Sequence, residues 1–196
     1  MGAVPTLTES DLACEIPAEF AWRRYDAHPY YQLLAGRCLA GVDFVLLAPR
    51  GERAYLVEVK NYRVRFGAAA PAKLPKYARR PNALAEVLAR KAIDTREGLR
   101  LIDRHYRRRW YWPALGWAIG RGGFAETDAA FFTRAYAARS HHLCVVATDE
   151  AYAELPGFDA AAWRAAVERE LRGLVGGECR VIGGAASTYL IPPPAR

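Results

Sequence analysis

Two apolar, β-prone runs separated by a short polar break form the clearest pattern in the chain. The first run covers residues 41–47, the second covers residues 54–62, and Gly51 lies in the break between them. Runs of this kind around a break that contains glycine predict a β-hairpin. Neither run has a clear polar face, so we expect both strands to be covered on both sides.

The predicted hairpin sets two carboxylates against each other. A turn centred between Arg50 and Gly51 leaves Asp43 and Glu58 equally far from its centre, so these two residues oppose each other. Opposed residues share a face, with Cβ atoms roughly 4.5–5.5 Å apart. Lys60 points to the same face because it lies two residues beyond Glu58. On spacing alone, a solvated strand face is an equally good interpretation, but the apolar neighbours favour a buried pair.

A divalent cation between Asp43 and Glu58 would relieve the repulsion, because buried charges are paired or bound to a metal. Hard oxygen ligands with room for water molecules suit Mg²⁺, with Mn²⁺ as a substitute. Such a cation, together with the ammonium of Lys60, would lower the cost of forming hydroxide and of holding negative charge on a phosphate.

Asp43, followed by Glu58, Val59 and Lys60 on the next strand, resembles the core of the PD-(D/E)xK nucleases, the restriction-endonuclease-like superfamily. The resemblance covers the hairpin and, more loosely, residues 10–150. It implies an α/β fold with a mixed β-sheet flanked by helices. It also implies a metal held by Asp43, Glu58 and the backbone carbonyl of Val59, with Lys60 orienting or activating the attacking water. Residue 42 is valine rather than the proline of the family pattern, at a position where members vary.

Residues 8–35 are expected to be mainly helical, with interruptions at Pro17 and Pro29. The resemblance implies a helix here that can supply another acid to the site. Glu19 is the favoured additional acid, although a surface position is the simpler interpretation of each candidate. The candidates are Glu15, Glu19 and Asp26.

The clearest helix spans residues 82–105, with Asn82 as its expected N-cap. An apolar stripe with i, i+3/i+4 spacing contains Lys91. In the nuclease-like fold this helix packs near the site and often contributes a polar side chain. We therefore expect Lys91 to be a second cation that contacts phosphate; the alternative is an ammonium that reaches solvent from the helix flank. The other members of the stripe are Leu84, Leu88, Thr95, Leu99 and Ile102.

The C-terminal part, about residues 141–191, predicts a strand, a helix and a second strand. Asp159 is the expected helix cap, and Gly176 and Gly177 are expected to end the helix. A crossover of this length suits parallel strand pairing. A further helix is expected over residues 127–138. We expect residues 1–196 to form a single nuclease-like domain, with a core over about residues 10–150.

Basic residues are concentrated after the hairpin. Between Arg50 and Arg109 there are 17 Lys or Arg and 6 Asp or Glu, a balance of +11, whereas the whole chain carries +7. Clustered cations are the electrostatic signature of a polyanionic partner; the alternative is a solvated surface in an arginine-rich proteome. The residues expected to contact nucleic acid are Arg63, Arg65, Lys73, Lys76, Arg107, Arg108 and Arg109.

Several other chemistries are disfavoured. No apolar run approaches the ~20 residues of a membrane helix, and four scattered cysteines suit a reduced, cytoplasmic setting. Adjacent His141 and His142 would point to opposite faces of a strand and could not chelate one metal together. Walker A, GxGxxG and GxSxG motifs are absent.

The sequence therefore predicts a Mg²⁺-dependent nuclease that acts on DNA rather than RNA, as an endonuclease rather than an exonuclease. Two alternatives stay open. One is a non-catalytic module that binds nucleic acid, and the other is a protein-interaction scaffold in a DNA repair or defence complex. A homodimer would suit double-strand cleavage, and a protein partner would suit the scaffold.

Overall fold

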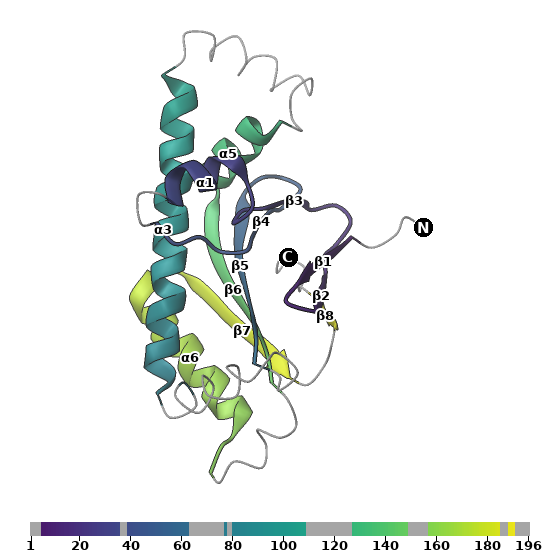
Figure 1. Cartoon of the computed structure of the whole chain (residues 1–196), viewed down its shortest axis with the longest axis vertical. Coiled ribbons are helices and arrows are strands. Elements are labelled where there is room, and N and C mark those ends of the chain that lie inside the picture. The colour runs from purple at the N-terminus through teal and green to yellow at the C-terminus, as the bar shows by residue number, and fades with distance from the viewer. Residues whose placement is uncertain are drawn as a thin grey trace.

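The computed structural model describes residues 5–35, 39–62, 77, 80–108, 127–148, 157–184 and 188–190. A five-stranded mixed sheet forms its centre (Figure 1). The strands of this sheet, in spatial order, are β3 (Ala21–Arg24), β4 (Phe44–Leu47), β5 (Arg53–Asn61), β6 (Arg139–Ala147) and β7 (Glu178–Gly184). A second sheet consists of β1 (Thr6–Glu9), β2 (Leu12–Glu15) and β8 (Thr188–Leu190). The helices are α1 (Pro29–Ala35), α3 (Pro81–Arg107), α5 (Asp128–Ala137) and α6 (Ala160–Val175).

The hairpin formed by β4 and β5 has the predicted register. Phe44 pairs with Val57 and Leu47 pairs with Ala54 in an antiparallel ladder. Gly51 lies in the turn with a φ of 71°, a left-handed conformation that glycine adopts without steric cost. On its other edge β5 runs parallel to β6, which in turn runs parallel to β7. The mixed sheet is therefore confirmed.

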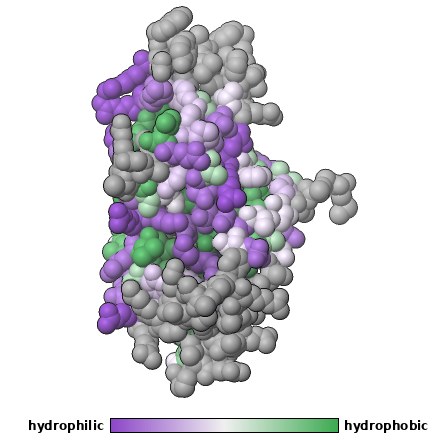
Figure 2. Space-filling view, in the orientation of Figure 1, coloured by the Kyte–Doolittle hydropathy of each residue, from purple (hydrophilic) through white to green (hydrophobic). Residues whose placement is uncertain are grey.

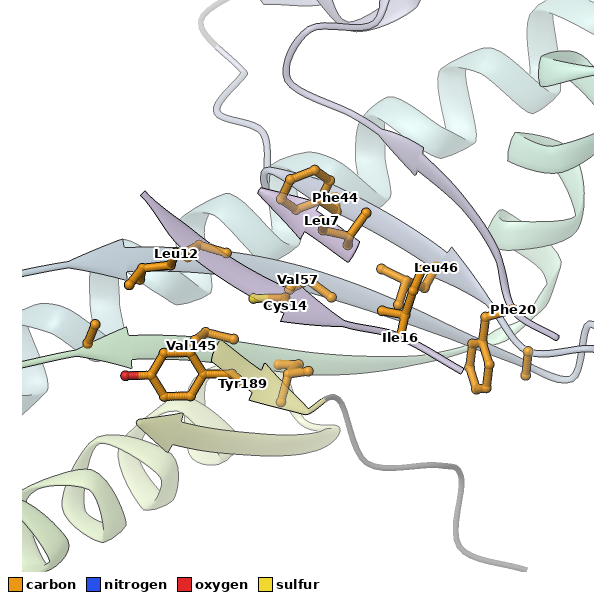
Figure 3. Packing of buried hydrophobic residues seen from close by; sticks show 14 residues of the cluster. Leu7, Leu12, Cys14, Ile16, Phe20, Phe44, Leu46, Val57, Val145 and Tyr189 are labelled. Carbon is orange, nitrogen blue, oxygen red and sulfur yellow. The ribbon is translucent and has the colours of Figure 1, made fainter. Parts of the chain in front are cut away.

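The central sheet lies between a layer of helices and the smaller sheet (Figure 1). Along β5, Leu56 packs with α3 and α5, whereas Val57 packs with the small sheet. Figure 3 shows Leu7, Cys14 and other small-sheet residues lying over the central strands. The prediction of a sheet flanked by helices holds for one face, and the second face is covered by strands.

The prediction of helix over most of residues 8–35 is wrong, because this segment contains β2, β3 and the end of β1 before the short α1. Leu12, Cys14 and Ile16 are buried at every second position, which is the period of a strand with one covered face. Ser10 and Asp11 both have positive φ, 52° and 59°. Two such residues in succession suit the tight turn of a twisted hairpin.

The later helices lie where the sequence places them. α3 begins at Pro81, and its N-cap is Arg80 without a side-chain hydrogen bond, so the prediction of Asn82 as the cap is wrong. Proline suits the first helical position because it lacks an N–H and has a preset φ. α6 is capped by Asp159 and ends at Gly176, whose φ is 65°. Of the helices described, none is long and apolar enough to cross a membrane.

Candidate active site

Four side chains singled out in the sequence come together at the carboxyl end of β5. The ammonium of Lys91 lies 2.6 Å from Glu58 Oε1 and 3.9 Å from Asp43 Oδ1. The ammonium of Lys60 also pairs with Glu58 Oε1. The structure thus places two carboxylates and two ammonium groups in one cluster, as the hairpin register and the stripe on α3 predict.

Asp43 immediately precedes β4 and is held by backbone contacts. Its Oδ2 accepts a hydrogen bond from the Val59 N–H at 2.7 Å, and its carbonyl accepts one from the Tyr25 N–H at 2.8 Å. A little upstream, the Ala40 N–H donates to Asp94 Oδ2 on α3 at 2.9 Å. The segment that leads into β4 is therefore fixed to both β5 and α3.

Thr95 on α3 connects the segment before β4 to the helical turn that carries Lys91. Its hydroxyl accepts from the Val42 N–H at 3.0 Å and donates to the Lys91 carbonyl at 2.7 Å. Thr95 is completely buried. One hydroxyl therefore ties the residue before Asp43 to the helical turn of Lys91, which sets the spacing between this lysine and the carboxylates.

The two carboxylates are buried, whereas the lysines reach the surface. Asp43 and Glu58 are 8% and 3% exposed, and the side chains of Lys60 and Lys91 are 26% and 24% exposed. Burial, followed by the charge of Glu58, raises the pKa of Asp43 to about 7, although the Val59 N–H and both lysines act to lower it. Burial acts to lower the pKa of Lys60, but Glu58 outweighs it and the pKa is raised. Asp43 is thus held in an environment that disfavours its charge.

The donor set of this cluster suits a divalent cation. Glu58 Oε2 is buried and has no hydrogen-bond partner, which leaves one carboxylate oxygen unused next to Asp43. The N–H and C=O of one strand residue point to the same side; since the Val59 N–H points to Asp43, its carbonyl also faces this edge. Within the described residues no group of three or more His, Cys, Asp or Glu side chains converges. Two hard carboxylates, a carbonyl and water molecules match the preference of Mg²⁺, which keeps several waters when bound.

Glu19 does not join this cluster, contrary to the prediction. It is exposed and lies in the turn that precedes β3. In the β3–β4 ladder, Ala21 pairs with Leu47 and Arg24 pairs with Phe44, so Glu19 lies near the end of β4 farthest from Asp43. The helix expected to supply an acid is absent from this part of the described chain because the segment forms strands.

The predicted nucleic-acid contacts are only partly within the described residues. Arg107 is exposed and pairs with Asp103 at 2.9 Å, and Arg108 is exposed at the end of α3. With a helical rise of 1.5 Å per residue, Arg107 lies roughly 24 Å along α3 from Lys91. Both arginines are therefore distant from the acidic pair. The other predicted contacts, Arg63, Arg65, Lys73, Lys76 and Arg109, lie outside the described residues.

Two residues close to the cluster, Thr95 and Arg24, were not predicted to belong to the site. The sequence pattern places Thr95 in the apolar stripe of the helix. The feature that could have pointed to its role is that it is a polar residue in that stripe, one turn after Lys91. Arg24 lies over the Phe44 ring at 5.9 Å and pairs with Glu9 and Asp26. Nothing in the sequence pattern placed Arg24 beside the acidic strand, because its segment was expected to be helical.

His141 and His142 do point to opposite faces, as predicted. His141 stacks near Tyr55 with ring centroids 5.2 Å apart and pairs with Glu178 at 2.9 Å. His142 lies on the other face, where burial, with Arg96 and His141, lowers its pKa to about 4. Neither histidine contributes to the cluster around Glu58.

Comparisons of the chain with protein-family models, with curated proteins and with solved structures find no match. The function therefore has to be inferred from the geometry and chemistry of Asp43, Glu58, Lys60 and Lys91.

Proposed function

We propose that this chain is a metal-dependent nuclease of the PD-(D/E)xK type that hydrolyses phosphodiester bonds in DNA, as an endonuclease. The observation that carries the proposal is the buried pair of Asp43 and Glu58, with Glu58 Oε2 unused and two lysines at its exposed rim. A structural ion pair would not need a second carboxylate with a raised pKa. Perturbed and partly unsatisfied groups of this kind are typical of functional sites.

Asp43, Glu58 and the carbonyl of Val59 would hold the cation. When bound, Mg²⁺ or Mn²⁺ acts as a Lewis acid on a phosphate oxygen and lowers the pKa of water. The burial of both carboxylates matters here, because an acid excluded from bulk water gains more from a cation than an exposed acid does. The contact between Asp43 and the Val59 N–H fixes the orientation of one ligand before any cation arrives.

The two lysines would act on the water and on the phosphate. Lys60 lies on the same face of β5 as Glu58, and its ammonium can donate hydrogen bonds to an incoming water or to a phosphate oxygen. Lys91 reaches the site from α3. Preorganised cations at the position where negative charge develops stabilise the transition state of phosphoryl transfer. Attack by water on phosphorus then breaks one P–O bond and leaves a nicked strand.

The charge distribution supports a polyanionic substrate. The balance of +11 between Arg50 and Arg109 falls on the part of the chain that carries Glu58, Lys60 and Lys91. On the face seen in Figure 2 hydrophilic side chains predominate, and the apolar ones form separate patches. The described atoms on this face therefore form no continuous apolar patch.

A cleavage assay tests the proposal. The purified chain is incubated with supercoiled plasmid, single-stranded DNA and RNA, each with Mg²⁺, Mn²⁺ or EDTA. We expect nicking or linearisation of the plasmid that requires the metal and is lost in Glu58→Gln and Lys60→Ala. Glu97→Gln is the matched control, because Glu97 is an α3 acid outside the cluster that pairs with Arg100.

The outcomes separate the candidate functions. Cleavage that persists in Glu58→Gln would point to a contaminating nuclease and contradict the proposal. Salt-sensitive binding of DNA without cleavage by the folded wild type would favour the non-catalytic module. Preferential cleavage of RNA would keep the site but overturn the choice of DNA.

A further inference from the structure

The ammonium of Lys91 occupies the position where the two carboxylates converge. It contacts Glu58 Oε1 at 2.6 Å and lies 3.9 Å from Asp43 Oδ1. Lys60 also pairs with Glu58 Oε1. The turn of α3 that carries Lys91 is fixed by the hydroxyl of Thr95, which donates to the Lys91 carbonyl. Lys91 is therefore a built-in cation at the acidic pair.

A divalent cation bound to the same carboxylates would lie within a few ångströms of this ammonium. The electrostatic repulsion between a divalent cation and an ammonium at such a distance, next to buried groups, is many times the thermal energy. Lys91 and the metal thus compete for Asp43 and Glu58. The departure of Lys91 leaves Glu58 paired with Lys60 and leaves Asp43 bonded to the Val59 N–H, so the carboxylates keep partners.

We infer that Lys91 is a resident counter-cation that weakens metal binding to the free protein, and that a phosphate of the substrate removes this competition by attracting the ammonium. The inference rests on the proposed function, since it assumes that the acidic pair holds the metal. Lys91 has a flexible four-carbon stem, and its side chain is 24% exposed. Its ammonium can therefore leave the carboxylates for a phosphate without any change in α3.

The consequence is a coupling between metal and substrate. If a phosphodiester frees the carboxylates, it tightens metal binding, and by linkage the metal tightens binding of the phosphodiester by the same factor. Removal of the Lys91 charge should tighten metal binding even when no substrate is present. A merely structural lysine would not do so, because its loss would weaken the site or leave it unchanged.

The test is Mn²⁺ binding to the full chain, measured as free Mn²⁺ by electron paramagnetic resonance, without substrate. We expect Lys91→Met to bind Mn²⁺ about tenfold tighter than the wild type, within the usual range of coupling. Lys91→Arg keeps the charge and should resemble the wild type. Lys91→Gln serves as a second neutral variant if Lys91→Met does not fold, and Glu58→Gln reports binding outside the acidic pair.

A second arm adds a DNA oligonucleotide with a phosphorothioate backbone, corrected for the Mn²⁺ that it binds by itself. The oligonucleotide should tighten Mn²⁺ binding in the wild type and have little effect in Lys91→Met. Equal affinities of wild type and neutral variants, both above that of Glu58→Gln, would overturn the inference and leave the proposed function standing. Affinities no higher than that of Glu58→Gln in every variant would overturn both.

Discussion

Asp43 is a residue that the fold holds at a cost. Its side chain is buried next to the carboxylate of Glu58, and burial is the main cause of its raised pKa. The hydrogen bond from the Val59 N–H and the nearby ammonium groups of Lys91 and Lys60 offset only part of this cost. A residue that is unfavourable for stability and favourable for function is expected where a site needs charge in a buried place.

Asp43→Asn should therefore make the protein more stable. Asparagine keeps an oxygen that can accept from the Val59 N–H but removes a buried negative charge. We expect the free energy of unfolding, measured by urea denaturation at pH 8 without metal, to rise by about 1–2 kcal/mol, while cleavage is lost. Asp159→Asn is the control, since asparagine caps a helix as well as aspartate does. A clear loss of stability in Asp43→Asn would mean that its charge stabilises the fold through Lys91.

The sequence predicted much of the site at this scale. Successive side chains of a strand point to opposite faces. This period and the position of the turn were enough to predict that Asp43, Glu58 and Lys60 share one face. Lys91 could be found because it interrupts an apolar stripe. The role of Thr95 could not be found, since a buried threonine in a helix gives no sign of which distant N–H its hydroxyl accepts from.

At the scale of elements, the hydroxyl of Thr95 is one of the contacts that join α3 to the segment before β4. In Thr95→Val the Val42 N–H would lose its acceptor in a fully buried position. An unsatisfied buried donor costs about 1–3 kcal/mol, so we expect a loss of stability of that size by chemical denaturation. Thr95→Ser keeps the hydroxyl and should recover most of the stability and of the cleavage rate. Equal losses in the two variants would show that the methyl group, not the hydroxyl, matters.

The packing of β6 against the helices predicts a dependence of stability on pH. His142 is buried, its Nδ1 has no partner, and its pKa is lowered to about 4. Between the unfolded pKa near 6.5 and this value, the unfolded chain binds the proton and the folded chain does not, so stability falls as the pH falls. Relative to His142→Leu, the wild type should lose about 3 kcal/mol between pH 7 and pH 4. Parallel pH profiles of the two proteins would contradict this assignment.

Element prediction succeeded where several signals agreed. For α6, the cap at Asp159, the apolar period and the terminal Gly176 all indicate the same bounds. It failed over residues 8–35, where the predicted helix interrupted by Pro17 and Pro29 is in fact a set of short strands followed by α1. The buried alternation of Leu12, Cys14 and Ile16 was present, but the Ser10–Asp11 turn is not the asparagine–glycine pair that makes a hairpin obvious.

At the scale of the whole molecule, the charge distribution predicts how DNA binding responds to salt. The affinity should fall steeply as salt rises, because each phosphate contact releases a counter-ion. Replacing Arg107 and Arg108 together by alanine should weaken binding and reduce the slope of log affinity against log salt by about one per arginine in contact. Arg164 and Arg169 on α6, outside the basic block, provide the control pair. A flat salt response of the wild type would remove the case for a basic binding surface.

The layer arrangement was only half predictable. A hairpin followed by a parallel crossover indicates a mixed sheet with helices, and that is the order from β4 to β7. The second sheet joins β1 and β2 to β8, from opposite ends of the chain, with β8 parallel to β2. Local patterns carry no information on such a long-range pairing. The apolar runs on both faces of β5 showed only that both faces would be covered.

The most direct test of the central claim is the anomalous scattering of manganese in crystals soaked in saturating MnCl₂, for the wild type and for Lys91→Met. We predict a peak within bonding distance of Glu58 Oε2 and of the Asp43 carboxylate, with the Lys91 ammonium moved away in the wild type. The peak should be stronger in Lys91→Met crystals at lower Mn²⁺. Crystals of both proteins without a peak at this pair would contradict the assignment of Asp43 and Glu58 as a metal site, and with it the proposed nuclease.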